Sequence, residues 1–289
     1  MPNPALYVAA QRQAFTAKSP DLRRSLFWGI RSPIPLWLNQ TLMLTGAAAP
    51  LALWLIVVLF MGHGSLFLPT PMGILHAGAR LWDSGLLASD VLASSSRVCG
   101  GFLLAALIGI PLGLLCGTFR TMESLFTPLV GTIRYMPVTA FVPLVIMWVG
   151  IGELSKVLII FLGVVFYNIL MISDAVRFVP VELVNSTYTL GGKRRDVLMR
   201  VIAPATLPGI LDTLRVNVSG AWNYLVIAEL IGASDGLGFR IVKAQRFLDT
   251  NLIFVCILII GAIGITLDLG FRGLLRWLVP WSQHGTATA

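Results

Sequence analysis

Residues 189–209, TLGGKRRDVLMRVIAPATLPG, decide how the rest of the chain is interpreted. The segment is basic and rich in turn-forming residues, and long apolar runs precede and follow it. A double glycine permits a sharp turn, and prolines interrupt or begin helices. We therefore expect a polar element between two apolar segments, and its meaning depends on whether those segments span a membrane.

The composition favours an all-α integral membrane protein. Of the 289 residues, 56% are hydrophobic and only 12% are charged, whereas soluble domains carry about a quarter charged residues. The net charge of +8 would suggest nucleic acid as a partner of a soluble protein, but Lys and Arg also gather on the cytoplasmic side of membrane proteins. We expect membrane lipid around this chain and no nucleic acid.

Six apolar runs are long enough to cross a bilayer at roughly 20 residues per helix. They cover about residues 42–62, 98–118, 125–150, 155–173, 209–233 and 251–270. These runs predict six transmembrane helices in a domain over residues 42–282, with tails at 1–41 and 283–289. Residues 26–38 are a candidate interfacial helix, and the turn signal LPTPMG at 68–73 precedes a candidate surface helix.

Smaller features of the apolar runs carry packing predictions. Small residues recur every fourth position from Gly101 to Gly117, which favours close helix packing. Prolines in the third run predict bends. The three cysteines, Cys99, Cys116 and Cys256, lie in apolar runs without metal-ligand spacing, so we expect them to be buried and expect no metal site.

The distribution of positive charge predicts the orientation. Six spans place both termini on one side, and Lys and Arg are concentrated in the first tail and in the segment between the fourth and fifth runs. The positive-inside rule then places both termini, and the loop of about residues 175–208, in the cytoplasm.

The cytoplasmic loop has the pattern of a short helix pair. Residues from Glu182 to Leu190 can form one helix, and Gly191-Gly192 permit the turn. Pro204 is expected to end the second helix, whose apolar face would consist of Val197, Leu198, Val201 and Ile202. The pattern predicts an amphipathic pair flat beneath the spans, and a solvated loop is the alternative.

This loop resembles that of binding-protein-dependent ABC transporter permeases. Their pattern is Glu-Ala-Ala, three residues, Gly, nine residues, Ile, one residue, Leu-Pro. Gly191 takes the glycine position, Val201 the isoleucine, and Ala203-Pro204 the final pair. Asn185-Ser186-Thr187 stands in place of Glu-Ala-Ala, so contacts that depend on that carboxylate are in question.

Further stretches are similar to the nitrate/sulfonate/taurine/bicarbonate branch of that family. They are LPTPMGIL at 68–75, PLVIMWVGIGELSK at 143–156 and AWNYLVIAELIGASDGLGFRI at 221–241. The resemblance implies a type I ABC importer permease in a bacterial inner membrane, with a cytoplasmic coupling helix between the fourth and fifth spans. It implies a path for a small anion or related solute of the nitrate, bicarbonate, sulfonate or taurine class.

The resemblance also implies the partners. They are a second permease copy, two ATP-binding subunits that hold ATP and Mg, and a periplasmic or lipid-anchored solute-binding protein. The residues expected to couple to the ATPase are Leu190, Gly191, Gly192, Arg194, Val197, Val201 and Pro204. Because the chain contains no G-x-x-x-x-G-K-[ST] phosphate loop, we expect this chain to have no catalytic residues and no cofactor.

The fifth run is unusually polar for a membrane span. Asp212, Arg215, Ser219, Trp222 and Glu229 recur near one helical stripe, with Asn223 beside it. Ionisable residues in spans usually face the bundle interior or a water-filled cavity. The predicted path residues are Arg134, Ser219, Trp222, Asn223 and Glu229. The alternatives are an Asp212–Arg215 pair, Glu229 at the outer interface, and an Arg134 that snorkels to the headgroups.

Three basic residues follow the turn DGLG at 235–238. Arg240, Lys243 and Arg246 are three apart and would share one broad helical face on the external side. We expect this face to meet acidic residues of a binding protein or to attract an anionic solute, and a solvated face is the alternative.

Two other classes of protein are kept as alternatives. A secondary carrier often shows internal repeats, and none is evident here. An intramembrane enzyme needs a nucleophile–base or metal constellation, but His63, His76 and His284 are scattered along the sequence.

Overall fold

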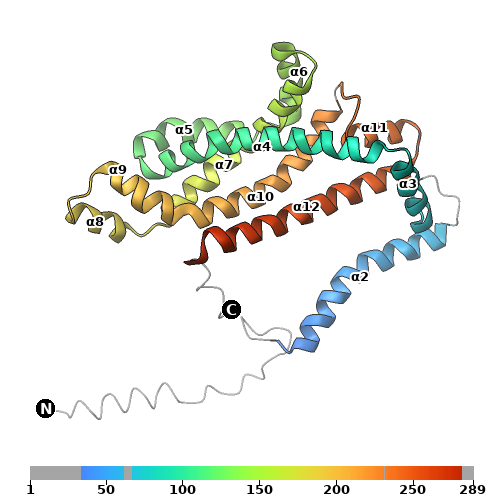
Figure 1. The fold of residues 1–289 in the computed structure, drawn as a ribbon, viewed down its shortest axis with the longest axis horizontal. Coiled ribbons are helices and arrows are strands. Elements are labelled where there is room, and N and C mark those ends of the chain that lie inside the picture. The colour runs from blue at the N-terminus through green and yellow to red at the C-terminus, as the bar shows by residue number, and fades with distance from the viewer. Residues whose placement is uncertain (1–33, 62–66, 231, 282–289) are drawn as a thin grey trace, which may run out of the picture. The chain divides into compact units, whose positions relative to one another are not determined.

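The computed structural model describes residues 34–61, 67–230 and 232–281, and these residues form helices without strands (Figure 1). In chain order the helices are α2 (Leu36–Met61), α3 (Pro71–Asp83), α4 (Leu86–Thr118), α5 (Arg120–Ile133), α6 (Val138–Val149), α7 (Glu153–Arg177), α8 (Val181–Thr189), α9 (Arg194–Asp196), a π-helical turn (Val197–Ile202), α10 (Ala203–Glu229), α11 (Leu237–Arg246) and α12 (Thr250–Leu278).

The chain divides into two units, with the boundary after Val57, inside α2. The first unit contains most of α2, an apolar helix of 26 residues. Most of the candidate interfacial helix, as well as His63 and His284, lies outside the described residues. The site is built entirely from the second unit.

The number of candidate spans agrees with the six apolar runs. Five helices are long and apolar enough to cross a membrane, and α5 with α6 makes a sixth candidate as a bent pair. α2 and α4 begin at Leu36 and Leu86, earlier than the apolar runs suggested. The expected surface helix is α3, whose first turn is capped by the Thr70 hydroxyl accepting from the Gly73 N–H at 3.1 Å.

Helix α7 is the centre of the second unit, because it packs against both α4 and α10, and α12 packs against α10. The side chains of Ile160, Ile172 and Leu225 are fully buried there. The small-residue ladder of α4 faces α7: a Cβ added to Gly113 would lie 2.7 Å from Ile172 Cβ, and the same crowding holds at Gly101. The ladder therefore permits a close backbone approach, as predicted.

The cysteines follow this packing. Cys116 and Cys256 are buried, as expected, but Cys99 is exposed. Our prediction for Cys99 was wrong because the neighbouring Gly101 faces α7, which turns Cys99 toward the outside of the helix.

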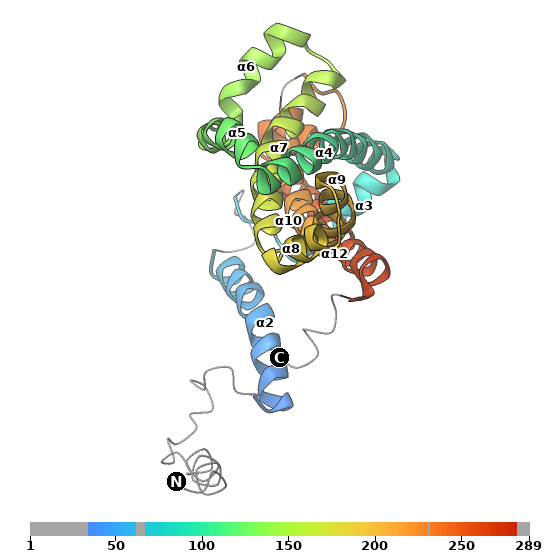
Figure 2. The ribbon, with the colours of Figure 1, turned by 90° about the vertical axis from the view of Figure 1, so that its left-hand side faces the viewer.

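The third apolar run is broken into two helices. α5 and α6 meet at an angle of 100° across residues 134–137. Pro137 is the N-cap of α6, and a residue before proline is disfavoured in the helical conformation, so the chain turns here. α6 projects from the side of the other helices in both ribbon views (Figures 1 and 2).

Pro204 does not end a helix, contrary to our expectation. The chain is helical from Arg194 to Glu229, with a π-helical turn at Val197–Ile202 immediately before α10. Pro204 occupies the first turn of α10, where a missing N–H is tolerated. The predicted flat second helix is therefore the beginning of a spanning helix.

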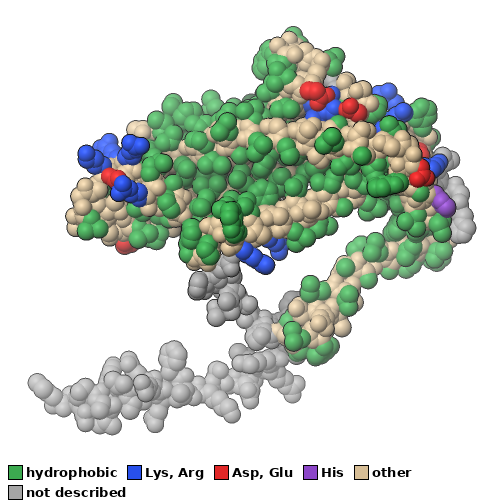
Figure 3. Space-filling model, viewed as in Figure 1, with side chains coloured by type: hydrophobic (Ala, Val, Ile, Leu, Met, Phe, Trp, Pro, Cys, Tyr) green, Lys and Arg blue, Asp and Glu red, His purple; other side chains and the backbone are tan. Residues whose placement is uncertain are grey.

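Charged side chains gather at two opposite ends of the second unit (Figure 3). One end carries α8 and α9, which lie beside the start of α10 (Figure 2), and we call it the α8 end. The other carries α3 and α11, and we call it the α11 end. Between the two ends, the surface that Figure 3 displays is rich in apolar side chains, apart from a group of Lys and Arg side chains at its lower edge, as expected for a largely membrane-embedded surface.

Candidate functional site

The turn after α8 depends on Gly191. Its φ is +82°, a left-handed conformation that glycine adopts readily and β-branched residues avoid. The Gly191 N–H donates to the Tyr188 carbonyl at 3.0 Å, and the Gly192 N–H donates to the Thr187 carbonyl at 2.9 Å. Because space is open where a Cβ on Gly191 would lie, the glycine is needed for conformation rather than for packing.

This turn presents an exposed apolar residue at the α8 end. Leu190 is 88% exposed, and Arg194 and Pro204 are also exposed. The opposite side of the segment is anchored, since Val197 and Ile202 are buried against Val176 of α7. The predicted apolar face is thus only partly buried, because Val201 is half-exposed. The segment has one side fixed to the spans and one side free for a partner.

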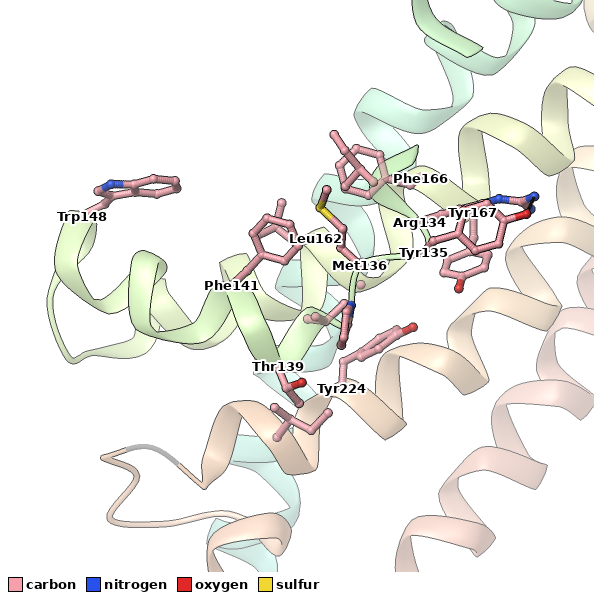
Figure 4. Close-up of a pocket in the computed structure, with 15 residues that line it drawn as sticks. Arg134, Tyr135, Met136, Thr139, Phe141, Trp148, Leu162, Phe166, Tyr167 and Tyr224 are labelled. Carbon is pink, nitrogen blue, oxygen red and sulfur yellow. Dashed lines mark hydrogen bonds between the residues drawn. The ribbon is translucent and has the colours of Figure 1, made fainter. Parts of the chain in front are cut away.

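A cavity of about 550 Å³ opens at the bend between α5 and α6 (Figure 4). The bend contributes the residues from Ile133 to Thr139, α7 contributes Phe166 and Tyr167, and α10 contributes Tyr224. Four of its lining residues lie near the middle of α7, because 162, 163, 166 and 167 flank the centre of a helix that runs from 153 to 177. The cavity therefore lies about half-way between the two charged ends.

Arg134 is the basic residue of this cavity. It is exposed, and its Nη2 donates to the Tyr135 hydroxyl at 2.8 Å, while the guanidinium carbon lies 4.7 Å from the centroid of the Tyr135 ring. Within the described ranges no carboxylate forms an ion pair with Arg134. Among the described residues, the side-chain hydrogen bond of Arg134 therefore goes to a neutral hydroxyl, and no carboxylate balances its positive charge.

The predicted polar stripe of α10 divides into two groups. Ser219 and Asn223 are exposed, whereas Trp222 is 5% exposed and Glu229 is 1% exposed. The Asp212 and Arg215 side chains pair at 2.9 Å, which is the alternative left open by the sequence. Trp222 packs in the core that α4, α7 and α10 share, so the structure does not bring it together with Ser219 and Asn223.

Both carboxylate oxygens of Glu229 accept hydrogen bonds from protein groups at the α11 end. Its Oε1 accepts from the Ser94 hydroxyl at 2.8 Å and from Arg97 Nη1 at 2.7 Å. Its Oε2 accepts from the Gly238 N–H at 2.7 Å, in the first turn of α11. The carboxylate therefore ties the end of α10 to α4 and α11, and it faces neither the cavity nor open solvent.

Arg97 is the centre of this network, and our sequence analysis assigned no role to it. Its Nε donates to Glu153 Oε2 at 2.6 Å and its Nη2 to Glu153 Oε1 at 2.8 Å, a two-pronged pair. Nη2 also donates to Asp235 Oδ1 at 2.5 Å, and Nη1 to the Asp235 carbonyl at 2.9 Å. One guanidinium thus joins α4, α7, α10 and the segment before α11. Lys156 adds a bond from Nζ to Glu153 Oε1 at 2.7 Å.

A second buried pair lies beside it. Arg240 Nη2 is 2.6 Å from Asp90 Oδ2, and Asp90 Oδ1 accepts from the Gly236 N–H at 2.9 Å. Asp90, Ser94 and Arg97 recur at spacings of four and three, so one face of α4 carries all three; that periodicity was the signal that could have revealed the network. We call these residues with Glu153, Lys156, Glu229, Asp235 and Arg240 the charge cluster.

The three basic residues of α11 do not share one exposed face. Arg240 is 9% exposed and belongs to the charge cluster, whereas Lys243 and Arg246 are exposed. Our expectation for Arg240 was wrong because spacing fixes the face of a helix but not what packs against it. Phe247, 76% exposed, follows Arg246.

The described residues contain no group of three or more His, Cys, Asp or Glu side chains that could hold a metal ion. The fold and the site define a multi-pass membrane protein: it has several apolar spans, a broken span beside a cavity that lies near the middle of α7, and a turn with an exposed side at one end.

The chain belongs to the family of binding-protein-dependent transport system inner membrane components, whose family model matches residues 109–284. It is 35% identical over 256 residues to the taurine transport system permease protein of Escherichia coli, covering 87% of this chain and 92% of that one. It is 34% identical to a putative aliphatic sulfonates transport permease protein of Bacillus subtilis, covering 85% of this chain and 88% of the other.

A third relative is the bicarbonate transport system permease protein of Synechococcus elongatus, with 30% identity over 68% of this chain and 71% of the other. The fold is similar to that of a chain in inward-facing structures of the MetNI methionine ABC transporter, with a TM-score of 0.59 at 18% identity over 67% of this chain and 96% of that one. The protein is accordingly a membrane-spanning permease subunit of an ABC importer, and its ATPase is a separate subunit.

Proposed function

We propose that this permease imports a small anion, or a related solute, of the taurine, sulfonate, nitrate or bicarbonate class. The relatives named for taurine, aliphatic sulfonates and bicarbonate support this class. The observation that carries it is Arg134, a cation that has no carboxylate partner among the described residues and that lines a cavity beside the middle of α7. Charged residues within membrane spans commonly mark substrate or ion pathways.

The path in this proposal follows the exposed side of α10. Ser219 and Asn223 are exposed there, and Tyr224 on the same helix lines the cavity with Arg134. Trp222 and Glu229, which the sequence also suggested, are left out of the path because both are buried among protein groups.

The α8 end is the proposed cytoplasmic side and the site of coupling to the ATPase. Leu190 and Arg194 would contact the ATPase, Gly191 and Gly192 would shape the turn, and the anchored Val197, with Val201 and Pro204, would pass movement into α10. This orientation follows the positive-inside rule and puts both termini in the cytoplasm of a bacterial inner membrane. The tails would be residues 1–35 and 283–289, because α2 already begins at Leu36 and not at the predicted residue 42. ATP and Mg would bind two partner ATPase subunits.

The α11 end is then external. Lys243 and Arg246 would meet acidic residues of a periplasmic or lipid-anchored solute-binding protein, because both are exposed at that end. A second copy of this chain would complete the membrane path.

The coupling role is tested at Gly191 in liposomes that contain the assembled transporter. Gly191→Val should abolish stimulation of ATP hydrolysis by loaded binding protein, because valine resists positive φ. Gly191→Asn is the matched control and should retain most of the stimulation, since asparagine tolerates that conformation. Full stimulation in the valine variant, with normal membrane insertion, would contradict the proposed role of this turn.

A further inference from the structure

The depth, charge and wall residues of the cavity at the α5–α6 bend indicate the chemistry of the solute. The depth of the cavity in the membrane is one indication. α7 has 25 residues, so it is about 37 Å long at 1.5 Å per residue, which exceeds a hydrocarbon core of about 30 Å. The cavity lies at the middle of this helix, and a side chain there is too deep to reach either headgroup layer easily.

The charge of the cavity is a second indication of the chemistry of the solute. Arg97 and Arg215 also belong to spanning helices, and each is paired with carboxylates. Arg134 has none in the described part of the chain, and the tyrosine hydroxyl that accepts from it is uncharged. An unpaired cation at this depth is costly, and an incoming anion would remove that cost by charge-assisted hydrogen bonds.

The side chains that form the walls of the cavity are a third indication of the chemistry of the solute. Apart from Arg134, they are largely aromatic and aliphatic, with Phe141, Phe166, Tyr167 and Tyr224 among them. Figure 4 shows these rings around the bend that carries Arg134. An inorganic anion such as nitrate or bicarbonate has no apolar body to place on these walls, and the walls supply few hydrogen-bond donors to replace its water. An anion with an apolar body would place that body on the rings.

We infer that the cavity binds a small organic anion by its sulfonate or carboxylate group at Arg134, with the apolar body against Phe166, Tyr167 and Tyr224. A volume of about 550 Å³ lies within the usual range for small-molecule sites, roughly 300–1,000 Å³. The inference rests on the proposed import function, and it narrows the solute from any small anion to an organic anion with an apolar body.

The test measures binding to the purified permease–ATPase complex in phosphatidylcholine nanodiscs, with radiolabelled benzenesulfonate as the probe. Unlabelled propanesulfonate should displace the label, and nitrate or bicarbonate at equal concentration should not. Arg134→Gln should weaken binding at least about tenfold, because a charged hydrogen-bond donor is lost. Arg134→Lys, which keeps the charge, should weaken it less.

A second variant separates the contribution of the aromatic wall to binding from the contribution of the Arg134 charge. Tyr224→Ala should weaken binding of benzenesulfonate more than binding of methanesulfonate, since only the former has a ring to lie on the wall. Tyr135→Phe is the matched control, because it removes the hydroxyl that accepts from Arg134 and leaves the cation available to the probe. Circular dichroism and thermal unfolding confirm that each variant is folded.

The outcomes separate this inference from the proposed function. Displacement of the label by nitrate as effective as by propanesulfonate, or binding unaffected by Arg134→Gln, would overturn the inference. ATP-driven uptake is measured in parallel: uptake of an inorganic anion, insensitive to Arg134→Gln, would also overturn it while supporting import. Binding of benzenesulfonate that depends on Arg134, in a complex that imports no anion, would refute the proposed function and leave the site standing.

Discussion

Arg97 and Arg134 are both arginines of membrane-spanning segments, and the protein treats them in opposite ways. The Arg97 side chain is 3% exposed and bonds to Glu153, Glu229 and Asp235. Arg134 is exposed on a cavity and bonds to a single neutral hydroxyl. A charge whose hydrogen bonds are all made within the protein holds helices together, whereas one left without a carboxylate is free to receive an anion.

The largest expected effect is the loss of the Arg97 side chain. Arg97→Met would leave the Glu229 carboxylate, whose side chain is 0% exposed, without its cation. Removing one member of a buried pair typically destabilises a protein by about 3–5 kcal/mol. We expect a loss of that size in the free energy of unfolding of the chain in detergent, measured by chemical denaturation.

Two control variants distinguish the paired Arg97 from the unpaired Arg134. Arg134→Gln should not lower the free energy of unfolding by more than about 0.5 kcal/mol, because no ion pair is broken. Arg272→Gln, which breaks an exposed pair with Asp268 on the same helix, should cost less than about 1 kcal/mol. If Arg134→Gln destabilised the chain as much as Arg97→Met, the distinction between the two arginines would be wrong.

A smaller effect is expected for the second buried pair. Asp90→Asn removes the charge opposite Arg240 but keeps an oxygen for the Gly236 N–H, which donates at 2.9 Å. In a double-mutant cycle with Arg240→Gln, the coupling energy should be about 0.5–3 kcal/mol. Additive effects of the two substitutions would show that the pair contributes nothing to stability.

The smallest effect is expected at the exposed basic residues of α11. Replacing Lys243 and Arg246 with Gln should slow uptake from the binding protein at low ionic strength and matter little at high ionic strength, because exposed charges act mainly on encounter and are screened by salt. Uptake rates that are unchanged at both ionic strengths would leave these residues as a solvated surface only.

Much of the fold could be predicted from the sequence because membrane insertion is a local property. Each apolar run became a helix or a helix pair, and the ladder from Gly101 to Gly117 predicted which face of α4 packs closely. The 100° break in the third run was less visible, since its composition is continuously apolar. Pro137 was a signal, but a proline in a span can also bend a helix without breaking it.

The site was predictable in part. Gly191 and its turn followed from the residues themselves, and so did the pairing of Asp212 with Arg215 as an alternative. The charge cluster did not, because Arg97 pairs with residues far away in the sequence, such as Glu229. Periodicity likewise placed Arg240 with Lys243 on one helix face, but only tertiary packing buries it against Asp90.

The most direct test of the account asks whether the Arg134 cavity belongs to a water-accessible path. Thr139 lines the cavity, and Leu103 is a matched control that is 65% exposed near the middle of α4 and does not line the cavity. Each is replaced by cysteine in a chain whose Cys99, Cys116 and Cys256 are changed to Ala. The assembled transporter in liposomes is then treated with an anionic, water-soluble methanethiosulfonate.

We predict that Thr139→Cys reacts with the anionic reagent and that benzenesulfonate slows this reaction. Adding Arg134→Gln should slow labelling by the anionic reagent but not by a cationic one. Leu103→Cys should remain unlabelled because it faces lipid. Equal labelling at the two positions, or labelling at Thr139→Cys that is indifferent to Arg134, would contradict the claim that Arg134 draws an anion into a path across the membrane.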